Sequence, residues 1–420
     1  PQTCTGCGAC AARCPQRAIR MEIGEEGFVR PVIDADKCVG CGLCARICPA
    51  EHPVCENAEK PECLAAAAAD ELRRDSSSGA VFPLLAERVL QEGGTVFGAA
   101  RDEDGTVRHI GVDDLDGLRK LKSSKYVQSE TGNCYRQAEE LLKAGREVLF
   151  SGTPCQIAGL NAFLGRKYDN LLTVDVVCHG VPSPLAFRRY AEELTEEGKE
   201  KVLAVNFRDK VRGWYPYFLT VKTEENVYSS DCRENEFMRA FLANLCLRKS
   251  CAACPFARFP RQGDLTLGDF WGIGRHAPDL DDNLGTSLVL INTERGRRRM
   301  AELTPRLKFR RSLPLARAIE GNPSLVRPPV PHPQRDYFFA RLEQLPFKQN
   351  VSHCFNNRYD CGILNFWFGS NYGAMLTCYA LQESVKRLGL KPKVINYVPA
   401  NVNFAGSLAE TFAGKYLDLT

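Results

Sequence analysis

A cysteine pattern occurs twice within the first fifty residues and constrains this chain more than any other feature. The two segments read CTGCGACAARCP and CVGCGLCARICP, and each follows the spacing C-x2-C-x2-C-x3-C-P. In this spacing three thiolates hold one [4Fe-4S] cube, and the fourth cysteine, followed by a proline that turns the chain, ligates the neighbouring cube. Structural zinc or disulfides are the less favoured alternative, because zinc sites use paired rather than triplet spacing. The pattern predicts two [4Fe-4S] clusters that carry electrons.

Each predicted cube takes three cysteines from one segment and the last cysteine of the other segment. The first cube is assigned Cys4, Cys7, Cys10 and Cys48, and the second is assigned Cys38, Cys41, Cys44 and Cys14. Between the segments, residues 18–34 read as a pair of short strands around a glycine turn. Residues 1–57 are therefore predicted to form a bacterial-ferredoxin-like α+β domain.

The composition is that of a globular chain of two to four domains, with 420 residues and a net charge of +4. So small a charge argues against nucleic acid or an anionic membrane surface as a partner. No stretch of eighteen apolar residues occurs, and no signal peptide precedes Cys4. Twenty cysteines in a secreted protein would suggest disulfides, but the cluster spacing of the two N-terminal segments indicates a reducing cytoplasm instead. Because the chain begins at Pro1, almost inside a motif, we expect it to be a fragment.

The rest of the chain divides into four stretches. Residues 58–74 read as an alanine-rich linker helix, in which Cys63, like the nearby Cys55, is expected to be a spare thiol. Residues 75–322 alternate between helix and strand, which predicts an α/β domain with a largely parallel sheet. Residues 323–354, rich in proline and arginine, read as a second linker. Residues 355–420 predict one Rossmann-like βαβ unit, and a domain of this kind would continue beyond Thr420.

Four further cysteines stand at chemically suggestive places in the middle domain. Cys155 and Cys178 each follow a predicted buried strand, so both are expected at the carboxyl edge of the sheet, where open α/β sheets bind ligands. Cys251 and Cys254 add a CxxC pair, and Cys246 is a possible substitute ligand. The spacing leaves two interpretations open. In the first interpretation, all four thiols bind a third [4Fe-4S] cluster. In the second, Cys155 and Cys178 are small core residues, and Cys251 and Cys254 form a redox pair.

Three other features of this domain are weaker signals. The segment SSSGAVF, residues 76–82, reads either as an ordinary helix N-cap or as an anion cradle at a helix start. Lys125 lies in the polar stretch KLKSSKYVQS, where a solvated lysine is the default. His179, beside Cys178, reads as a satisfied structural histidine in preference to a proton carrier.

Taken in order, several segments resemble the β-subunit family of coenzyme F-420 hydrogenases and dehydrogenases. The resemblance covers about residues 1–322 and is carried by SSSGAVF, GGTVFGAA, SSKYVQS, VLFSGTPCQIAGL, VDVVCHGVPSP, RKSCAACPF and GDLTLGDFWGI. It implies FAD as the central redox cofactor and a [4Fe-4S] cluster held by Cys155, Cys178, Cys251 and Cys254. It also implies flavin contacts from two turns, namely Ser77, Ser78 and Gly79, and Ser124, Lys125 and Tyr126. Ala80 stands where relatives commonly carry a second glycine, and F-420 itself is not favoured as a substrate.

The tail segment FGSNYGAMLTCYALQESVKRLGLKPKVINY resembles the opening of a polysaccharide pyruvyl transferase domain. This resemblance implies a phosphoenolpyruvate donor, with catalytic groups that would lie beyond Thr420. The alternative is that the tail is a packing extension of the flavin domain.

Together these features predict a cytoplasmic iron–sulfur flavoprotein oxidoreductase. Electrons from a redox partner protein or a soluble donor would pass through the two ferredoxin-type clusters and a third cluster to FAD and an acceptor, in a reaction that the tail links to polysaccharide biosynthesis. One alternative is a pyruvyl transferase with an accessory redox domain. Another is a non-catalytic electron carrier that feeds a separate reductase.

Overall fold

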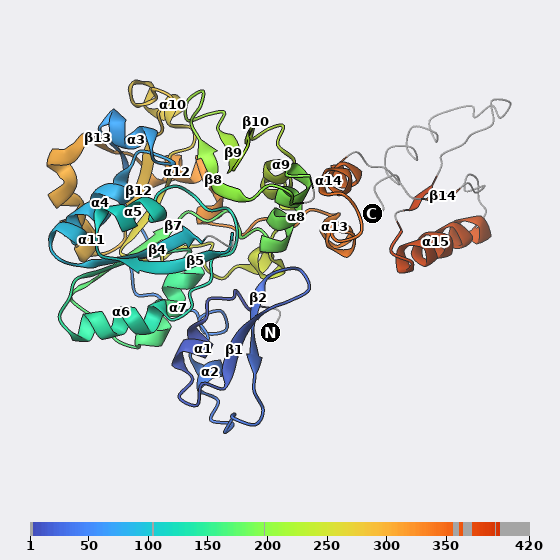
Figure 1. The fold of residues 1–420 in the computed structure, drawn as a ribbon, viewed down its shortest axis with the longest axis horizontal. Coiled ribbons are helices and arrows are strands. Elements are labelled where there is room, and N and C mark those ends of the chain that lie inside the picture. The colour runs from blue at the N-terminus through green and yellow to red at the C-terminus, as the bar shows by residue number, and fades with distance from the viewer. Residues whose placement is uncertain are drawn as a thin grey trace. The chain divides into compact units, whose positions relative to one another are not determined.

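The computed structural model describes residues 3–102, 105–196, 198–355, 361–363, 372–390 and 392–394. The chain divides into two compact units, Pro1–Val351 and Ser352–Thr420. The larger unit combines a small N-terminal module with a central mixed sheet and its covering helices, as Figure 1 shows. This is the expected α/β class with a ferredoxin-like module at its start.

The N-terminal module is built on the antiparallel hairpin β1 (Ile19–Ile23) and β2 (Val29–Ile33), which confirms the predicted strand pair. Two short helices, α1 (Ala9–Arg13) and α2 (Leu43–Arg46), each contain the third cysteine of one segment, Cys10 and Cys44. The helices pack against each other, and α1 also packs on α6 (Cys134–Lys143) and α7 (Pro154–Leu164) of the central part.

The central sheet has eight strands in the order β13-β3-β12-β11-β7-β6-β4-β5. Four adjacent strands, β11, β7, β6 and β4, are parallel to one another. The strands on either side of these four, β13, β3 and β12 at one edge and β5 at the other, pair antiparallel. The sheet is therefore mixed, with a parallel centre, rather than largely parallel. The strands are β3 (Glu62–Ala68), β4 (Thr95–Arg101), β5 (Val107–Val112), β6 (Val148–Gly152), β7 (Leu171–Val176), β11 (Leu265–Asp269), β12 (Ser287–Ile291) and β13 (Leu307–Ser312).

The strand β3 corrects the prediction of a linker helix over residues 58–74. The first four residues of the alanine run, residues 65–68, lie fully buried between β12 and β13, and only the short helix α3 (Asp70–Arg74) follows the run. Alanine favours helices in isolation, but here its small side chain suits a strand buried on both faces. Burial on two faces overrides the intrinsic preference.

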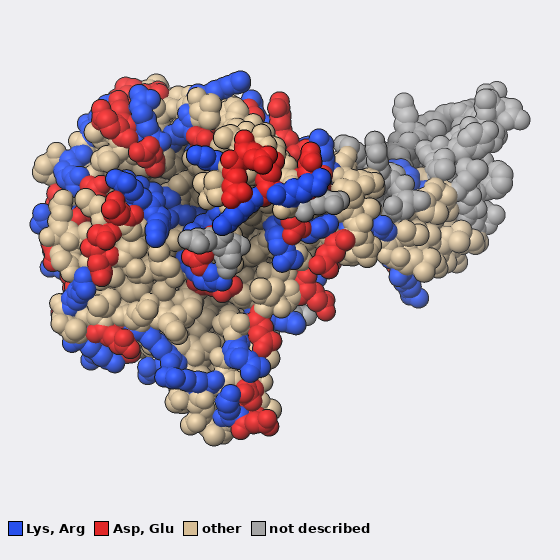
Figure 2. Space-filling view, in the orientation of Figure 1, with Lys and Arg blue, Asp and Glu red and all other residues tan. Residues whose placement is uncertain are grey.

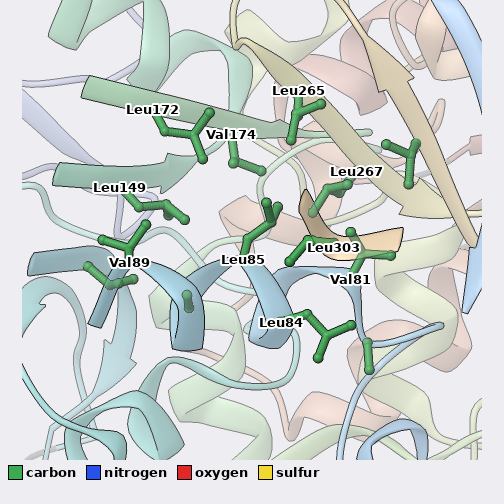
Figure 3. Packing of buried hydrophobic residues seen from close by; sticks show 14 of the residues in the cluster. Val81, Leu84, Leu85, Val89, Leu149, Leu172, Val174, Leu265, Leu267 and Leu303 are labelled. Carbon is green, nitrogen blue, oxygen red and sulfur yellow. The ribbon is translucent and has the colours of Figure 1, made fainter. Parts of the chain in front are cut away.

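Helices cover the sheet and complete its core. The cluster drawn in Figure 3 joins the apolar face of α4 (Val81–Gln91) to strand residues such as Leu149, Leu172 and Leu265. The remaining helices of the larger unit are α5 (Leu115–Leu121), α8 (Pro184–Leu194), α9 (Glu236–Leu242), α10 (Ile273–His276), α11 (Glu294–Leu303), α12 (Leu315–Gly321) and α13 (Arg335–Ala340), with the 3-10 turns η1 (Lys249–Ala253), η2 (Pro278–Leu280), η3 (Thr304–Arg306) and η4 (Pro323–Leu325).

A second sheet of the larger unit is the antiparallel meander β8 (Val202–Asp209), β9 (Phe218–Thr223) and β10 (Val227–Asp231). The stretch 323–354, predicted as a linker, contains η4, α13 and most of α14 (Phe347–Phe355). Phe338 and Phe347 within it are buried. This stretch is therefore packed structure for most of its length.

In the smaller unit, β14 (Cys361–Ile363) and β15 (Pro392–Val394) pair in parallel, and α15 (Tyr372–Arg387) connects them. This confirms the predicted βαβ unit. Residues 369–371 of the predicted glycine-rich turn and everything after residue 394 lie outside the described residues, and residues 372–374 of that turn belong to the start of α15. The pyruvyl transferase resemblance therefore stays a prediction.

Charges of both signs are interspersed over the face of the molecule shown in Figure 2, in keeping with the net charge of +4. No helix of the described residues combines the length and the apolar character that crossing a bilayer requires.

Candidate functional site

A cavity of about 600 Å³ lies in the larger unit, where the parallel strands β6, β7 and β11 end. The residues that follow β6 and β7, among them Thr153 and Cys178, form part of its wall. Ligands of open α/β sheets bind at this carboxyl edge, and the volume falls within the range of about 300–1,000 Å³ that is usual for small-molecule and cofactor sites.

The structure brings the four predicted ligands of the third cluster together at this edge. Cys155 lies in the first turn of α7, Cys178 follows β7, and Cys251 and Cys254 lie in and directly after η1. Burial raises the pKa of each thiol, and the pKa of Cys178 is raised further by its neighbours Cys251, Cys155 and Cys254. Cys155 and Cys178 line the cavity directly.

Four partly buried thiols in one place are a soft donor set of the kind that iron–sulfur clusters use. Among the described residues no three His, Cys, Asp or Glu side chains converge tightly enough to hold one metal ion. A cube binds each thiolate at a different iron atom, so its ligands do not have to meet at one point. The donor set thus fits a cluster.

Cys246, the possible substitute ligand, lies elsewhere. Burial raises the pKa of its thiol to about 12, and its charged neighbour is Arg335 rather than another cysteine. Cys63 is buried in β3, and Cys55 donates from Sγ to the carbonyl oxygen of Arg261 at 3.0 Å. These three thiols stand apart from the group of four.

The thiols of the first predicted cube gather across the two N-terminal segments. Burial raises the pKa of Cys10 to about 11, and the thiols of Cys4, Cys48 and Cys44 raise it further. Cys48, from the second segment, therefore lies beside cysteines of the first, as the crossed assignment requires. Cys44 is equally a neighbour, so the two predicted cubes adjoin. The assignment of each thiol to a cube stays a prediction.

The two N-terminal groups differ in exposure. Cys38 and Cys41 of the second group are exposed, whereas Cys7 of the first is buried. Cys14, the fourth predicted ligand of the second cube, accepts a hydrogen bond at Sγ from the Ala18 amide at 3.3 Å. One group thus faces the surface and the other faces the protein interior.

Cys7 lies at the junction with the central sheet. Burial raises the pKa of Cys7 to about 12, and Cys155 is among the charges that raise it further. A Cβ placed on Gly159 of α7 would lie 3.1 Å from Cys7 Sγ, so this glycine permits the close approach. Tyr135 of α6 donates its hydroxyl to the Cys7 carbonyl oxygen at 2.9 Å. The first N-terminal group and the four thiols of the central part are therefore neighbours.

Five of the six predicted flavin contacts line the cavity, namely Ser77, Ser78, Ser124, Lys125 and Tyr126. The two predicted turns meet, because both the amide and the hydroxyl of Ser124 donate to Ser77 Oγ at 2.9 Å. Gly79 does not line the cavity. A Cβ at Gly79 would collide with the Ala66 carbonyl oxygen of β3, so the glycine serves close packing.

The serines are not ordinary N-caps of α4. The cap position is Ala80, whose φ of 64° lies in the left-handed region, and within the described residues no side chain caps this end. Ser78 instead donates to the Thr286 carbonyl oxygen at 3.0 Å. The start of α4 thus lines the cavity without a serine cap, and Ala80 bears the strain that a glycine would avoid.

Lys125 is not a solvated lysine. Its Nζ donates to the carbonyl oxygens of Lys120, Lys122 and Ser123 at 2.9, 2.6 and 3.2 Å, at the carboxyl end of α5. Burial lowers its pKa to about 7. His179 also lines the cavity, and its Nε2 finds no hydrogen-bond partner among the described residues. The expectation of a fully satisfied histidine is therefore wrong at this atom.

Four residues of the site were not found from the sequence. His109 of β5 and Arg208 of β8 line the cavity, and Thr5 and Arg248 lie at the junction with the N-terminal module. Arg208 is 3% exposed, pairs with Asp269 at 2.9 Å and lies 3.9 Å from the ring centroid of Tyr217. A charged residue among the apolar positions of a strand was an available signal for Arg208, whereas the others belong to no recognisable motif.

Comparison with protein families supports the two chemical regions of the chain. Residues 3–52 match the 4Fe-4S dicluster domain, and residues 145–310 match the family described as the C terminus of the coenzyme F420 hydrogenase/dehydrogenase beta subunit. The predicted resemblance is confirmed over these ranges. The chain thus carries an iron–sulfur electron-transfer module joined to a region related to an oxidoreductase subunit family.

None of the curated proteins compared matches the chain. Among solved structures, one chain of the F420-reducing [NiFe] hydrogenase complex from Methanosarcina barkeri is similar, with 16% identity and a TM-score of 0.42, over 72% of this chain and 93% of that chain.

Proposed function

We propose that this protein is an iron–sulfur flavoprotein oxidoreductase whose clusters lead from the surface to the cavity. The exposed group with Cys38 and Cys41 would hold the cluster at which electrons enter, and the group with Cys7 would hold the next one. Cys155, Cys178, Cys251 and Cys254 would hold a third cluster beside the flavin. The observation that carries this proposal is the place of Cys155, which lies beside Cys7 and also in the cavity wall.

The residues of the cavity divide into those that would hold the flavin and those that would shape its surroundings. The linked turns at Ser77 and Ser124 present hydroxyl and amide groups suited to phosphate or ribose oxygens, beside the open start of α4. Lys125 and Arg208 add cationic character to the wall. A bound flavin would supply the conversion between single-electron and two-electron chemistry.

The cavity wall also contains a histidine that stays neutral at pH 7. His109 is buried, with Nδ1 2.7 Å from Ser129 Oγ and Nε2 3.0 Å from the Ser151 carbonyl oxygen. Since a carbonyl accepts only, Nε2 carries the proton and Nδ1 accepts from the serine. Burial lowers the pKa of His109 to about 4, so the ring is neutral at pH 7 and positions the wall instead of exchanging protons.

Anaerobic purification followed by iron and flavin analysis tests this proposal. We expect about twelve iron atoms per chain, as three cubes require, and flavin absorption bands beneath the cluster absorption. Changing Cys178 to alanine removes a ligand of the third cluster and is expected to lower iron to about eight atoms. Cys246→Ala, at a buried thiol outside the group, is the matched control and should leave iron unchanged.

Two results would contradict the proposal. Iron near eight atoms in the unaltered protein, without flavin, would indicate a carrier that feeds a separate reductase. Equal iron loss in the Cys178 and Cys246 variants would show that the loss comes from damaged packing and not from a missing ligand.

A further inference from the structure

Arg248 is a buried cation at the junction between the N-terminal module and the four thiols of the central part. Its side chain is 9% exposed. Its Nε donates to the Cys4 carbonyl oxygen and its Nη1 to the Val29 carbonyl oxygen, each at 2.9 Å, and Nη2 lies 3.8 Å from Cys4 Sγ. On the other side, the Arg248 carbonyl oxygen accepts from the Cys251 amide at 3.0 Å. The guanidinium is thus fixed beside one predicted cluster ligand, three residues from another.

No carboxylate compensates this charge within the described part of the chain. A second buried arginine at this junction, Arg335, shows the usual solution, a two-pronged ion pair with Glu26. An unpaired buried cation costs several kcal/mol. The anionic neighbours that remain for Arg248 are sulfurs. Burial raises the pKa of the Cys155 and Cys251 thiols, and the positive charge of Arg248 acts against this rise.

Thr5 is a second polar group without an ordinary partner at the same junction. Its hydroxyl is buried and makes no hydrogen bond with a nitrogen or oxygen of the described residues. Its neighbours are the thiols of Cys7 and Cys155. Burial is the larger effect and raises the pKa of both thiols, whereas the Thr5 hydroxyl lowers it. A buried hydroxyl left unpaired costs about 1–3 kcal/mol. A thiolate or cluster sulfur between the two cysteines would accept its hydrogen bond.

We propose that Arg248 and Thr5 form a shared polar bridge between the first N-terminal cluster and the third cluster, and that this bridge raises the reduction potentials of both. The inference rests on the proposed function, which supplies the third cluster. One electron leaves the first cluster as it is oxidised and enters the third as it is reduced, and no proton moves. Each reduction adds a negative charge, which a buried cation and a hydrogen bond to sulfur stabilise. Because one bridge serves both clusters, their potentials shift together.

A redox titration followed by electron paramagnetic resonance, on the full chain with its clusters, tests the bridge. In Arg248→Gln we expect the reduction potentials of the first N-terminal cluster and the third cluster, here called the junction clusters, to fall. At a fixed applied potential the ratio of oxidised to reduced cluster should rise about tenfold at both, which corresponds to a fall in reduction potential of about 59 mV for a one-electron couple. The exposed second cluster should not shift. Arg248→Lys should recover part of the potential, and Thr5→Val, which removes only the hydroxyl, should lower the same two potentials by less.

The matched control is Lys249→Gln, which removes one positive charge at the next residue. Its side chain is 62% exposed, so solvent and salt screen the charge and we expect no shift of either potential. A shift confined to one junction cluster, an equal shift of all three clusters, or no shift would each overturn the bridge. Where Arg248→Gln fails to assemble, Arg248→Lys and Thr5→Val decide by the same criteria. Iron near eight in the unaltered protein would instead refute the proposed function.

Discussion

The imidazole of His109 lies buried in the cavity wall, where Ser129 and Ser151 engage its two ring nitrogens. Burial lowers its pKa from 6.5 to about 4. The unfolded chain therefore binds a proton between these two values, and the folded chain does not. Stability from the neutral ring is fully present above about pH 6.5 and is lost as the pH falls toward 4.

We predict that acidification from about pH 7.5 to about 5.5 destabilises the protein by about 1.4 kcal/mol more than it destabilises a His109→Gln variant. Glutamine stays neutral over this range, so its variant keeps only the pH dependence of the other groups. Anaerobic denaturant unfolding of both proteins at the two pH values measures the difference. Equal losses in the two proteins would show that His109 is protonated in the folded state.

The alanine run of β3 shows where sequence patterns fail at the level of an element. Its residues favour helix in isolation, and no alternation marks the strand because both faces are buried. Ala66 faces the core beneath α4, and Ala65 faces the opposite core beside Phe270. In contrast, the hairpin of β1 and β2 and the strands before Cys155 and Cys178 have local signals, and these elements were predicted correctly.

Ala66→Val is expected to destabilise the protein by about 1–3 kcal/mol, because the added methyl groups would overpack the fully buried cluster that Ala66 shares with the apolar face of α4. Valine favours strands, so the loss would come from packing alone. Ala69→Val, at the exposed end of the same run, is the control and should change stability by less than about 0.5 kcal/mol. Denaturant unfolding measures both. A stabilised Ala66→Val protein would mean that α4 approaches β3 less closely than described.

For the molecule as a whole, the sequence predicted the thiols but not what joins them. The cysteine spacing and the strand-end rule located the groups around Cys7 and Cys155 separately. Their adjacency depends on contacts between residues more than a hundred positions apart, such as Tyr135 with Cys7 and Arg248 with Cys4. No local pattern encodes such pairs, so the order of the proposed electron route could be expected from the sequence, whereas the contact between the two thiol groups became visible only in the fold.

Another long-range contact joins the N-terminal hairpin to α13. Glu26, in the turn of the N-terminal hairpin, forms two hydrogen bonds at 2.9 and 2.6 Å with Arg335 of α13, which also donates to the Leu247 carbonyl oxygen. The pair lies between the N-terminal module and the packed stretch predicted as a linker. Its partial burial, with the Glu26 side chain 29% exposed, makes it stronger than a surface pair.

Glu26→Ala leaves the buried Arg335 guanidinium with only the exposed carboxylate of Asp336, 3.4 Å from Nη1. We therefore predict a loss of about 2–3 kcal/mol, less than for a fully buried pair. Glu25→Ala, at the exposed neighbouring position of the same turn, is the control and should be nearly neutral. Adding Arg335→Met to Glu26→Ala removes the uncompensated charge and should restore part of the stability. Denaturant unfolding of the unaltered protein, the three variants and Arg335→Met alone, with limited proteolysis at the module boundary, measures these effects. Additive losses in the double variant would show that the two side chains do not stabilise the docked module as a pair.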